Sequence, residues 1–205
     1  MEIFILLLIL FPAIVIHEYA HGWSAYHLGD PTAKEQGRLT LNPLKHVDPV
    51  GTILVPGAIF VLRLTGVNIP PIGWAKPVPV NFRRLRHPKG DMMLVALAGP
   101  VSNVLIALTA VQLIKLDLSP AFNQFFLMAV FINLLLAVFN MVPIPPLDGS
   151  RVVMAFLPNK LLYYYAQIER FGILIVVVLL NFGLFEKVVL PVVIILAKFM
   201  GSNLS

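Results

Sequence analysis

The chain has 205 residues, of which 59% are hydrophobic and only 12% are charged, and it carries a net charge of +5. This composition excludes an ordinary soluble domain, in which apolar residues make up about half of the chain, and indicates an integral membrane protein. The positive charge lies mostly in two stretches between apolar runs, which fits anchoring to one side of a lipid bilayer. We therefore expect the bilayer as a partner and no nucleic acid. Because the chain has no cysteine, a zinc site would have to use His, Asp or Glu.

Residues 3–28 are predicted to form the first membrane helix, ending at Gly29-Asp30-Pro31. A helix of this length rises about 39 Å, enough to cross a hydrocarbon core of about 30 Å with some tilt. We expect a permanent span rather than a cleaved signal peptide, because Glu2 is the only early charge and the apolar run is too long.

The sequence His17-Glu18-Tyr19-Ala20-His21 lies near the end of this predicted helix. Residues four apart share a helix face, so His17 and His21 can bind one metal ion. Glu18 is offset by one position and can instead act as general base on a metal-bound water. His21 lies about 12 Å along the axis from the helix end. We therefore expect a metal site below the membrane surface, reached by water through a protein-lined cavity.

The next part of the chain is predicted to be less regular. Residues 29–49 form a polar loop, and the apolar run 50–67 is marginal as a span. Residues 68–81 contain four prolines and predict an extended, re-entrant edge strand rather than a helix. A basic cluster follows, composed of Arg83, Arg84, Arg86, His87 and Lys89. The positive-inside rule places this cluster and the 29–49 loop in the cytoplasm, so 50–81 would enter and return on one side.

Four apolar segments complete the predicted fold, at 91–116, 121–142, 163–183 and 187–200. Together with the earlier segments they predict an all-α polytopic membrane protein with five or six membrane segments. We expect a single membrane-embedded domain over 1–205, with a motif-bearing core at 1–151 and C-terminal helices at 152–205.

A zinc hydrolase needs three protein ligands and an open fourth position. Asp148 is the best candidate for the third ligand, because it is a carboxylate at a broken helix end on the same predicted side as the motif. The alternative, compatible with the first, is that Asp148 caps a helix starting at Ser150. For the donor that stabilises an oxyanion, Asn140 is the first choice and Asn103 the second. Asn103 could instead only lock two helices together.

Three motifs in this order resemble the site-2 protease family of intramembrane zinc metalloproteases: HEYAHG at 17–22, AGPVSN at 98–103 and NMVPIPPLDG at 140–149. The stretches GRLTLNPLKHVDPVGT at 37–52 and GWAKPVPVN at 73–81 resemble a compact branch of that family without a PDZ or CBS domain. One departure is Gly149-Ser150, where many members have two glycines.

The resemblance implies that His17, His21 and Asp148 bind one Zn²⁺, that Glu18 is the catalytic base and that Asn140 sits beside the metal. It also implies a site open to the cytosol and a re-entrant strand at 73–81 that holds substrate. His46 would form a second-shell pair with Asp48 or contact substrate, and the alternative is a loop that caps itself through Asp48-Pro49.

We therefore expect an intramembrane zinc endopeptidase that acts on transmembrane protein substrates. Alternatives are a zinc transporter and a pseudoprotease scaffold. A transporter needs a polar path to both faces, whereas the candidate ligands fall toward one, and the intact Glu18 argues against a pseudoprotease. Because no organellar targeting peptide is recognisable, we expect a multi-pass protein of a prokaryotic cell membrane with the active site opening to the cytoplasm.

Overall fold

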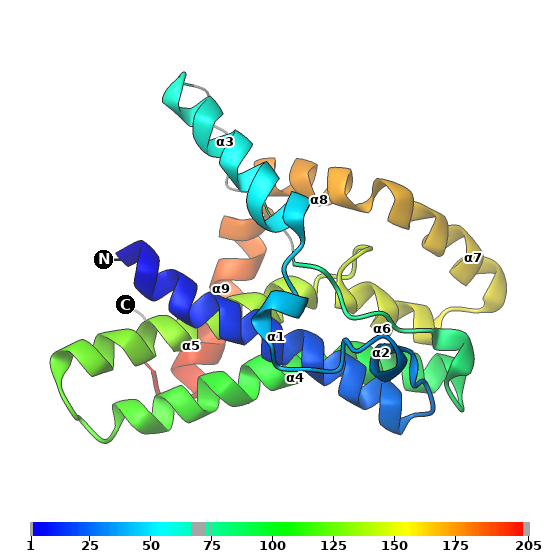
Figure 1. The fold of residues 1–205 in the computed structure, drawn as a ribbon, viewed down its shortest axis with the longest axis horizontal. Coiled ribbons are helices and arrows are strands. Elements are labelled where there is room, and N and C mark those ends of the chain that lie inside the picture. Colours follow the sequence, from blue (N-terminus) through cyan, green and yellow to red (C-terminus); the bar gives the residue numbers. More distant parts are fainter. Residues whose placement is uncertain (1, 67–72, 74, 203–205) are drawn as a thin grey trace.

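A computed structural model describes residues 2–66, 73 and 75–202 of the chain, and in these ranges the fold is helical with no β-strand. Short 3₁₀ and π-helical turns at 43–45, 49–54, 82–84, 168–171 and 185–189 link the α-helices. Figure 1 labels these helices, which are α1 (Glu2–His27), α2 (Thr32–Glu35), α3 (Val55–Leu64), α4 (Pro88–Ile114), α5 (Pro120–Asn140), α6 (Asp148–Phe156), α7 (Asn159–Gln167), α8 (Gly172–Asn181) and α9 (Leu190–Phe199).

The long helices α1, α4 and α5 form the packed body of the molecule, and α4 lies along both of the others (Figure 1). Ala107 and Ala110 of α4 are buried at this packing surface, where small side chains let helix backbones approach closely. Fully buried Val130 and Leu134 of α5 complete the same cluster, and α9 packs across α5 through Val193. The core therefore lies between the helices that carry the sequence motifs.

Within the described residues, four helical segments are long and apolar enough to cross a membrane: Phe4–His27, Pro88–Ile114, Pro120–Asn140 and Asn159–Asn181. The multi-pass prediction is confirmed at this level, but four such segments are fewer than the five or six expected. The run predicted to span at 187–200 is helical but is not among these four segments: the π-helical turn Phe185–Val189 runs directly into α9, which ends at Phe199.

The predicted edge strand at 68–81 is wrong for the part that the structure describes, while 68–72 and 74 lie outside the described residues. Residues 75–81 are non-helical, as expected, but they join no ladder. An edge strand tolerates prolines whose missing N–H groups face outward, but it needs a neighbouring strand, and the described residues contain none. The N–H groups of Lys76 and Val78 bond a loop carbonyl and a side chain instead.

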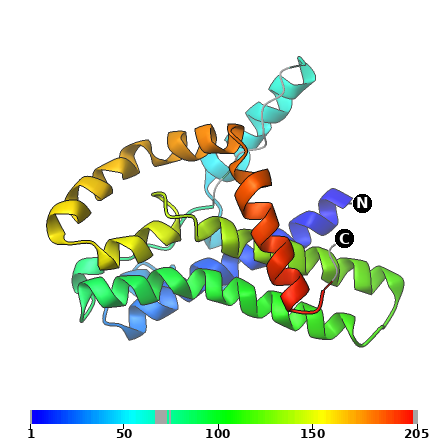
Figure 2. The ribbon, with the colours of Figure 1, turned by 180° about the vertical axis from the view of Figure 1, so that it is seen from behind.

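The C-terminal helices form a separate arm. Figures 1 and 2 show α7 and α8 leaving the body after α6 and arching back to it at α9. The 3₁₀ turn Ile168–Phe171 lies between these two helices and bends the run that the sequence predicts as a span at 163–183. The helix α3 also projects from the body in both views.

Candidate metal centre and active site

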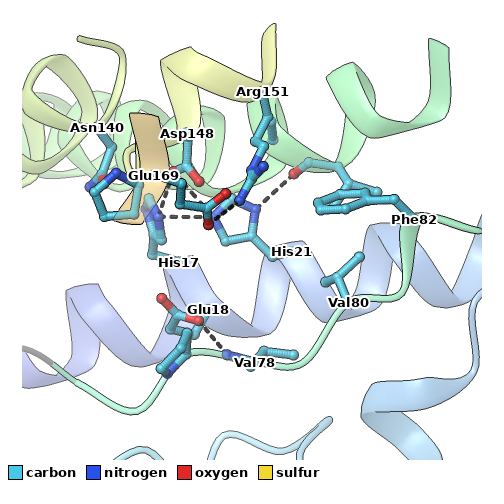
Figure 3. A pocket seen from close by; sticks show the side chains of 14 residues that line it. His17, Glu18, His21, Val78, Val80, Phe82, Asn140, Asp148, Arg151 and Glu169 are labelled. Carbon is cyan, nitrogen blue, oxygen red and sulfur yellow. Dashed lines mark hydrogen bonds and ion pairs between the residues drawn. The ribbon is translucent and has the colours of Figure 1, made fainter. Parts of the chain in front are cut away.

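His17 and His21 of α1 meet Asp148, the first residue of α6 (Figure 3). The two Nε2 atoms are 3.0 Å apart, and Asp148 Oδ2 lies 3.1 Å from His17 Nε2 and 3.2 Å from His21 Nε2. A tetrahedral zinc ion with bonds of about 2.0–2.2 Å would hold its ligand atoms about 3.3–3.6 Å apart. The three atoms are thus almost at the spacing of a zinc centre.

The outer nitrogens of both imidazoles are already bonded. Nδ1 of His21 donates to the carbonyl oxygen of Val95 at 2.7 Å, and Nδ1 of His17 donates to Asn103 Oδ1 at 2.5 Å. A neutral imidazole with its hydrogen on Nδ1 presents a lone pair at Nε2. Two such lone pairs and an oxygen of Asp148 therefore face one another. Three acceptors at this spacing repel unless a cation lies between them, so the donor set fits a metal ion.

Two buried asparagines fix this arrangement. Asn103 Nδ2 donates to Asn133 Oδ1 at 3.0 Å and to the carbonyl oxygen of Ala13 at 3.4 Å, so its Oδ1 must be the atom that faces His17. Asn133 Nδ2 in turn donates to the carbonyl oxygen of Ala129 at 2.9 Å. The sequence analysis did not single out Asn133, although a lone amide within an apolar span was the available signal.

Glycines let two backbones approach the centre. A Cβ atom on Gly99 of α4 would lie 2.6 Å from His17 Nε2 and would also collide with His21. A Cβ atom on Gly149 would collide with the carbonyl group of Met141. A side chain on Gly99 would therefore displace the imidazoles, and one on Gly149 would displace the turn that carries Asp148. These two close approaches account for the glycines of the AGPVSN and NMVPIPPLDG motifs.

Asp148 does not cap a helix. It is the first residue of α6, whose N-cap position is Leu147, and its Oδ2 is turned to the histidines instead. The capping alternative is therefore wrong. An ionised carboxylate is the form that a metal ion binds.

The centre opens into a cavity of about 340 Å³ (Figure 3). Glu18 lines it without joining the three-atom cluster, and its Oε2 accepts a 2.7 Å hydrogen bond from the backbone N–H of Val78. Asn140 also lines the cavity, and its Nδ2 donates to the carbonyl oxygen of Leu136 at 2.9 Å. Two charged residues of this wall, Arg151 and Glu169, were not predicted as site residues; they form an ion pair at 2.6 Å.

The remaining candidates lie elsewhere. Asn103 is fully buried behind His17, with its amide hydrogens used inside the protein. His46 does not line the cavity: its Nε2 bonds the carbonyl oxygen of Thr40 at 2.8 Å. The self-capping alternative is confirmed for Asp48, whose Oδ1 accepts from the N–H groups of Val50 and Gly51.

Long apolar helices around a buried His–His–carboxylate cluster, with a glutamate beside it, define a membrane-embedded metalloprotease. Comparison with known proteins agrees. The family described as Peptidase family M50 matches residues 111–182. "Putative zinc metalloprotease YwhC" of Bacillus subtilis (strain 168) is 40% identical over 184 residues, which cover 85% of this chain and 78% of the relative. The chain thus belongs to peptidase family M50, the site-2 proteases, whose members are zinc metalloproteases.

More distant relatives carry the same description. "Putative zinc metalloprotease Rip2" of Mycolicibacterium smegmatis is 31% identical over 171 residues, which cover 82% of this chain and 63% of the relative. Rip2 of Mycobacterium tuberculosis (strain H37Rv) is 26% identical over 170 residues, covering 82% and 62%. No solved structure matches the chain. The predicted family, enzyme class and zinc cofactor are confirmed.

Proposed function

We propose that the protein is an intramembrane endopeptidase that hydrolyses peptide bonds in or near transmembrane segments of other membrane proteins. The observation that carries this proposal is that three acceptor atoms converge beside a cavity: two from His17 and His21 of a span-length helix and one from Asp148 of α6. These residues would hold one zinc ion. When bound, zinc lowers the pKa of a water ligand to about 7 and polarises the carbonyl group under attack.

The chain's own residues supply the proton transfers. Glu18 takes the proton of the attacking water and passes it to the leaving amine nitrogen as the C–N bond breaks. Asn140 donates one amide hydrogen to Leu136, and its second amide hydrogen is left to bond the oxyanion of the tetrahedral intermediate. Because Gly99 has no side chain, the space beside the two imidazoles stays open. Asn103 keeps the His17 hydrogen on Nδ1 and Nε2 free for the metal.

The basic segment supports a site that opens to the cytoplasm of a prokaryotic cell. Arg84 and Arg86 lie next to Gly29 at the end of α1, the end nearer to His21. Loops rich in Lys and Arg stay on the cytoplasmic side of a membrane. The bacterial relatives agree with a prokaryotic setting. Labelling of a cysteine introduced at exposed Arg83 in intact cells tests the orientation: an impermeant maleimide should not reach it.

The transporter alternative is disfavoured by the packing beyond the metal centre. A transporter needs a polar path to both faces, yet Ala107, Val111, Val130 and Leu134 form a buried apolar cluster between α4 and α5. Among the described residues there, Asn103 and Asn133 are the only buried polar side chains. The pseudoprotease alternative is disfavoured by Glu18, which lines the cavity.

Zinc content and cleavage of a single-span substrate in detergent test the proposal, with the wild type compared to Glu18→Gln and Asp148→Ala. We expect one zinc per wild-type chain, zinc without cleavage in Glu18→Gln, and neither in Asp148→Ala. Cleavage that survives in Glu18→Gln would overturn the assignment of the base. Zinc that survives in Asp148→Ala would overturn the ligand set.

The proposed function also predicts a substrate preference. A peptide bond in a membrane helix must be unwound before attack, and each backbone group freed in lipid costs several kcal/mol. Spans with glycine or asparagine near the cut should therefore be hydrolysed faster than proline-free, leucine-rich spans of equal length. Equal initial rates for the two kinds of span would contradict this preference.

A further inference from the structure

Residues 75–81, here called the strap, run along the cavity without secondary structure of their own (Figure 3). Pro77, Val78 and Val80 line the cavity wall. The strap lies directly against α1: a Cβ atom on Gly22, one turn beyond Glu18, would lie 2.8 Å from Val78 Cγ1. The strap is therefore placed where it can act on the catalytic glutamate.

One end of the strap is held by Arg38. Its Nη2 donates to the carbonyl oxygens of Lys76 at 2.9 Å and Pro77 at 3.2 Å. The backbone N–H of Lys76 adds a 2.9 Å bond to the carbonyl oxygen of His46. Arg38 is only 8% exposed, its Nε has no hydrogen-bond partner, and no carboxylate of the described chain forms an ion pair with it. A buried cation is costly without such a partner, so its retention indicates a role.

The other end of the strap is held by Asp30. Its Oδ2 accepts a 2.6 Å hydrogen bond from the backbone N–H of Asn81, and its Oδ1 accepts from Thr32, so a fully buried carboxylate is bonded on both oxygens. The hydrogen bonds of Arg38 and of Asp30 thus hold the strap at Lys76 and at Asn81, five residues further along, and are here called the two clamps. Both clamps act on backbone atoms and fix the path of the strap between them.

Between these two ends, the backbone N–H of Val78 is the strap donor that bonds Glu18. Pro77 and Pro79 lack an N–H group, so Val78 has the only backbone donor in this tripeptide. That donor bonds Glu18 Oε2 at 2.7 Å, while no bond joins Oε1 to any residue that the structure describes. The strap therefore holds one carboxylate oxygen and leaves the other unengaged.

We propose that Arg38 is a positioning residue for catalysis: by clamping the strap, it fixes the Val78 N–H that orients Glu18. This inference rests on the proposed function, because it assigns the orientation of the proposed general base. Glu18 stands on a helix beside an open cavity, where its side chain has other rotamers available. A bond to one oxygen selects the rotamer, and misplacement of a catalytic group by about 1 Å costs up to about 100-fold in rate.

The test measures kcat, KM and zinc content for cleavage of a single-span peptide in detergent by the full chain. In Arg38→Ala we expect kcat to fall about 10- to 100-fold, with KM and zinc content unchanged. Arg38→Lys should recover part of kcat, because one ammonium can donate to both carbonyls as Nη2 does. Exposed Arg83, on the turn that follows the strap, provides the matched control, and Arg83→Ala should behave as wild type.

A second variant removes the donor itself. Val78→Pro removes the N–H, and position 78 already precedes a proline, so its backbone is restricted to the region that proline also adopts. We expect the same fall in kcat. Both changes act through the same hydrogen bond, from the Val78 N–H to Glu18. The double variant Arg38→Ala/Val78→Pro should therefore be no slower than the slower single variant. If Arg38→Ala does not fold, Val78→Pro decides alone.

Two results would overturn the inference: wild-type kcat in Val78→Pro, or losses that multiply in the double variant. Glu18→Gln separates this failure from failure of the proposed function. Inactive Glu18→Gln beside fully active strap variants refutes only the role of Arg38. Active Glu18→Gln refutes Glu18 as the base, and only a wild type that binds zinc but cleaves no span refutes the proposed function itself.

Discussion

The body formed by α1, α4 and α5 differs from the arm formed by α7 and α8 in how each is held. In the body, Val130 and Leu134 are completely buried, and polar groups such as Asn103 are bonded on every side. In the arm, large apolar side chains such as Ile173 and Leu174 are about 60% exposed. The body is held by continuous packing, whereas the arm presents its apolar surface outward, as lipid contact requires.

The arm nevertheless contacts the active site through polar groups. Tyr165 donates from its hydroxyl to the carbonyl oxygen of Pro143 at 2.5 Å, and Glu169 pairs with Arg151. Gly172 packs so closely on Pro145 that a Cβ atom there would collide with the carbonyl group. These contacts fall on the 143–151 region that carries Asp148. The body thus fixes the two histidines, while the third candidate ligand lies where body and arm meet.

The largest expected effect comes from filling the space that the body leaves for the metal. Gly99→Ala would place a methyl group against both imidazoles. We expect loss of zinc and loss of cleavage by more than 100-fold, because the ligands must separate to accommodate it. Metal analysis of the purified variant measures the first, and a peptide assay the second.

Gly90 provides a matched control in the same helix, because a Cβ atom there would meet nothing within 4 Å. Gly90→Ala should keep both zinc and activity. Equal behaviour of the two variants would refute the close approach of α4 to the metal centre.

A smaller effect is expected from Asn133→Ala, which leaves Asn103 free to turn its amide. Without the acceptor on Asn133, only the longer 3.4 Å bond to the carbonyl oxygen of Ala13 still favours Oδ1 facing His17, so the tautomer that binds metal is less firmly fixed. We expect zinc affinity to fall about 10- to 100-fold, the usual cost of losing an outer-shell partner. Competition with a chromophoric zinc chelator measures it.

Asn181 of the arm makes the same local bond, from Nδ2 to the carbonyl oxygen four residues earlier, but it is exposed and remote from the histidines. Asn181→Ala should therefore leave zinc affinity unchanged. If both variants lose affinity equally, the effect belongs to helix stability and not to the metal centre.

Local periodicity explains which features could be predicted from the sequence. Residues four apart share one face of a helix, so the spacing of His17 and His21 alone predicts that they meet. Asp148 is distant in sequence, yet the chemistry of a third ligand identified it. Asn133 and Arg38 were missed because their partners, Asn103 and the strap, are set by tertiary packing that no spacing reveals. Arg38 in particular looks like an ordinary loop cation until its burial is known.

The errors have physical causes as well. The strand expectation failed because a strand needs a partner strand, which the local sequence does not specify and the described residues do not provide. Pro77 and Pro79 instead flank the Val78 N–H that bonds Glu18. The count of five or six membrane segments stays a prediction, since length and composition identify four candidate spans among the described residues. The apolar run at 187–200 enters α9 only at Leu190, after a π-helical turn at 185–189.

The smallest effect is expected where the arm meets the body. Glu169→Gln removes the charge that pairs with Arg151, and both side chains are partly exposed, so the pair contributes at most about 1 kcal/mol. We expect zinc content to stay at one per chain and kcat/KM to change by less than about fivefold, since 1 kcal/mol corresponds to about that factor. A loss of zinc in this variant would mean that the arm, and not the body alone, fixes the position of Asp148. That result would remove the distinction between the two regions.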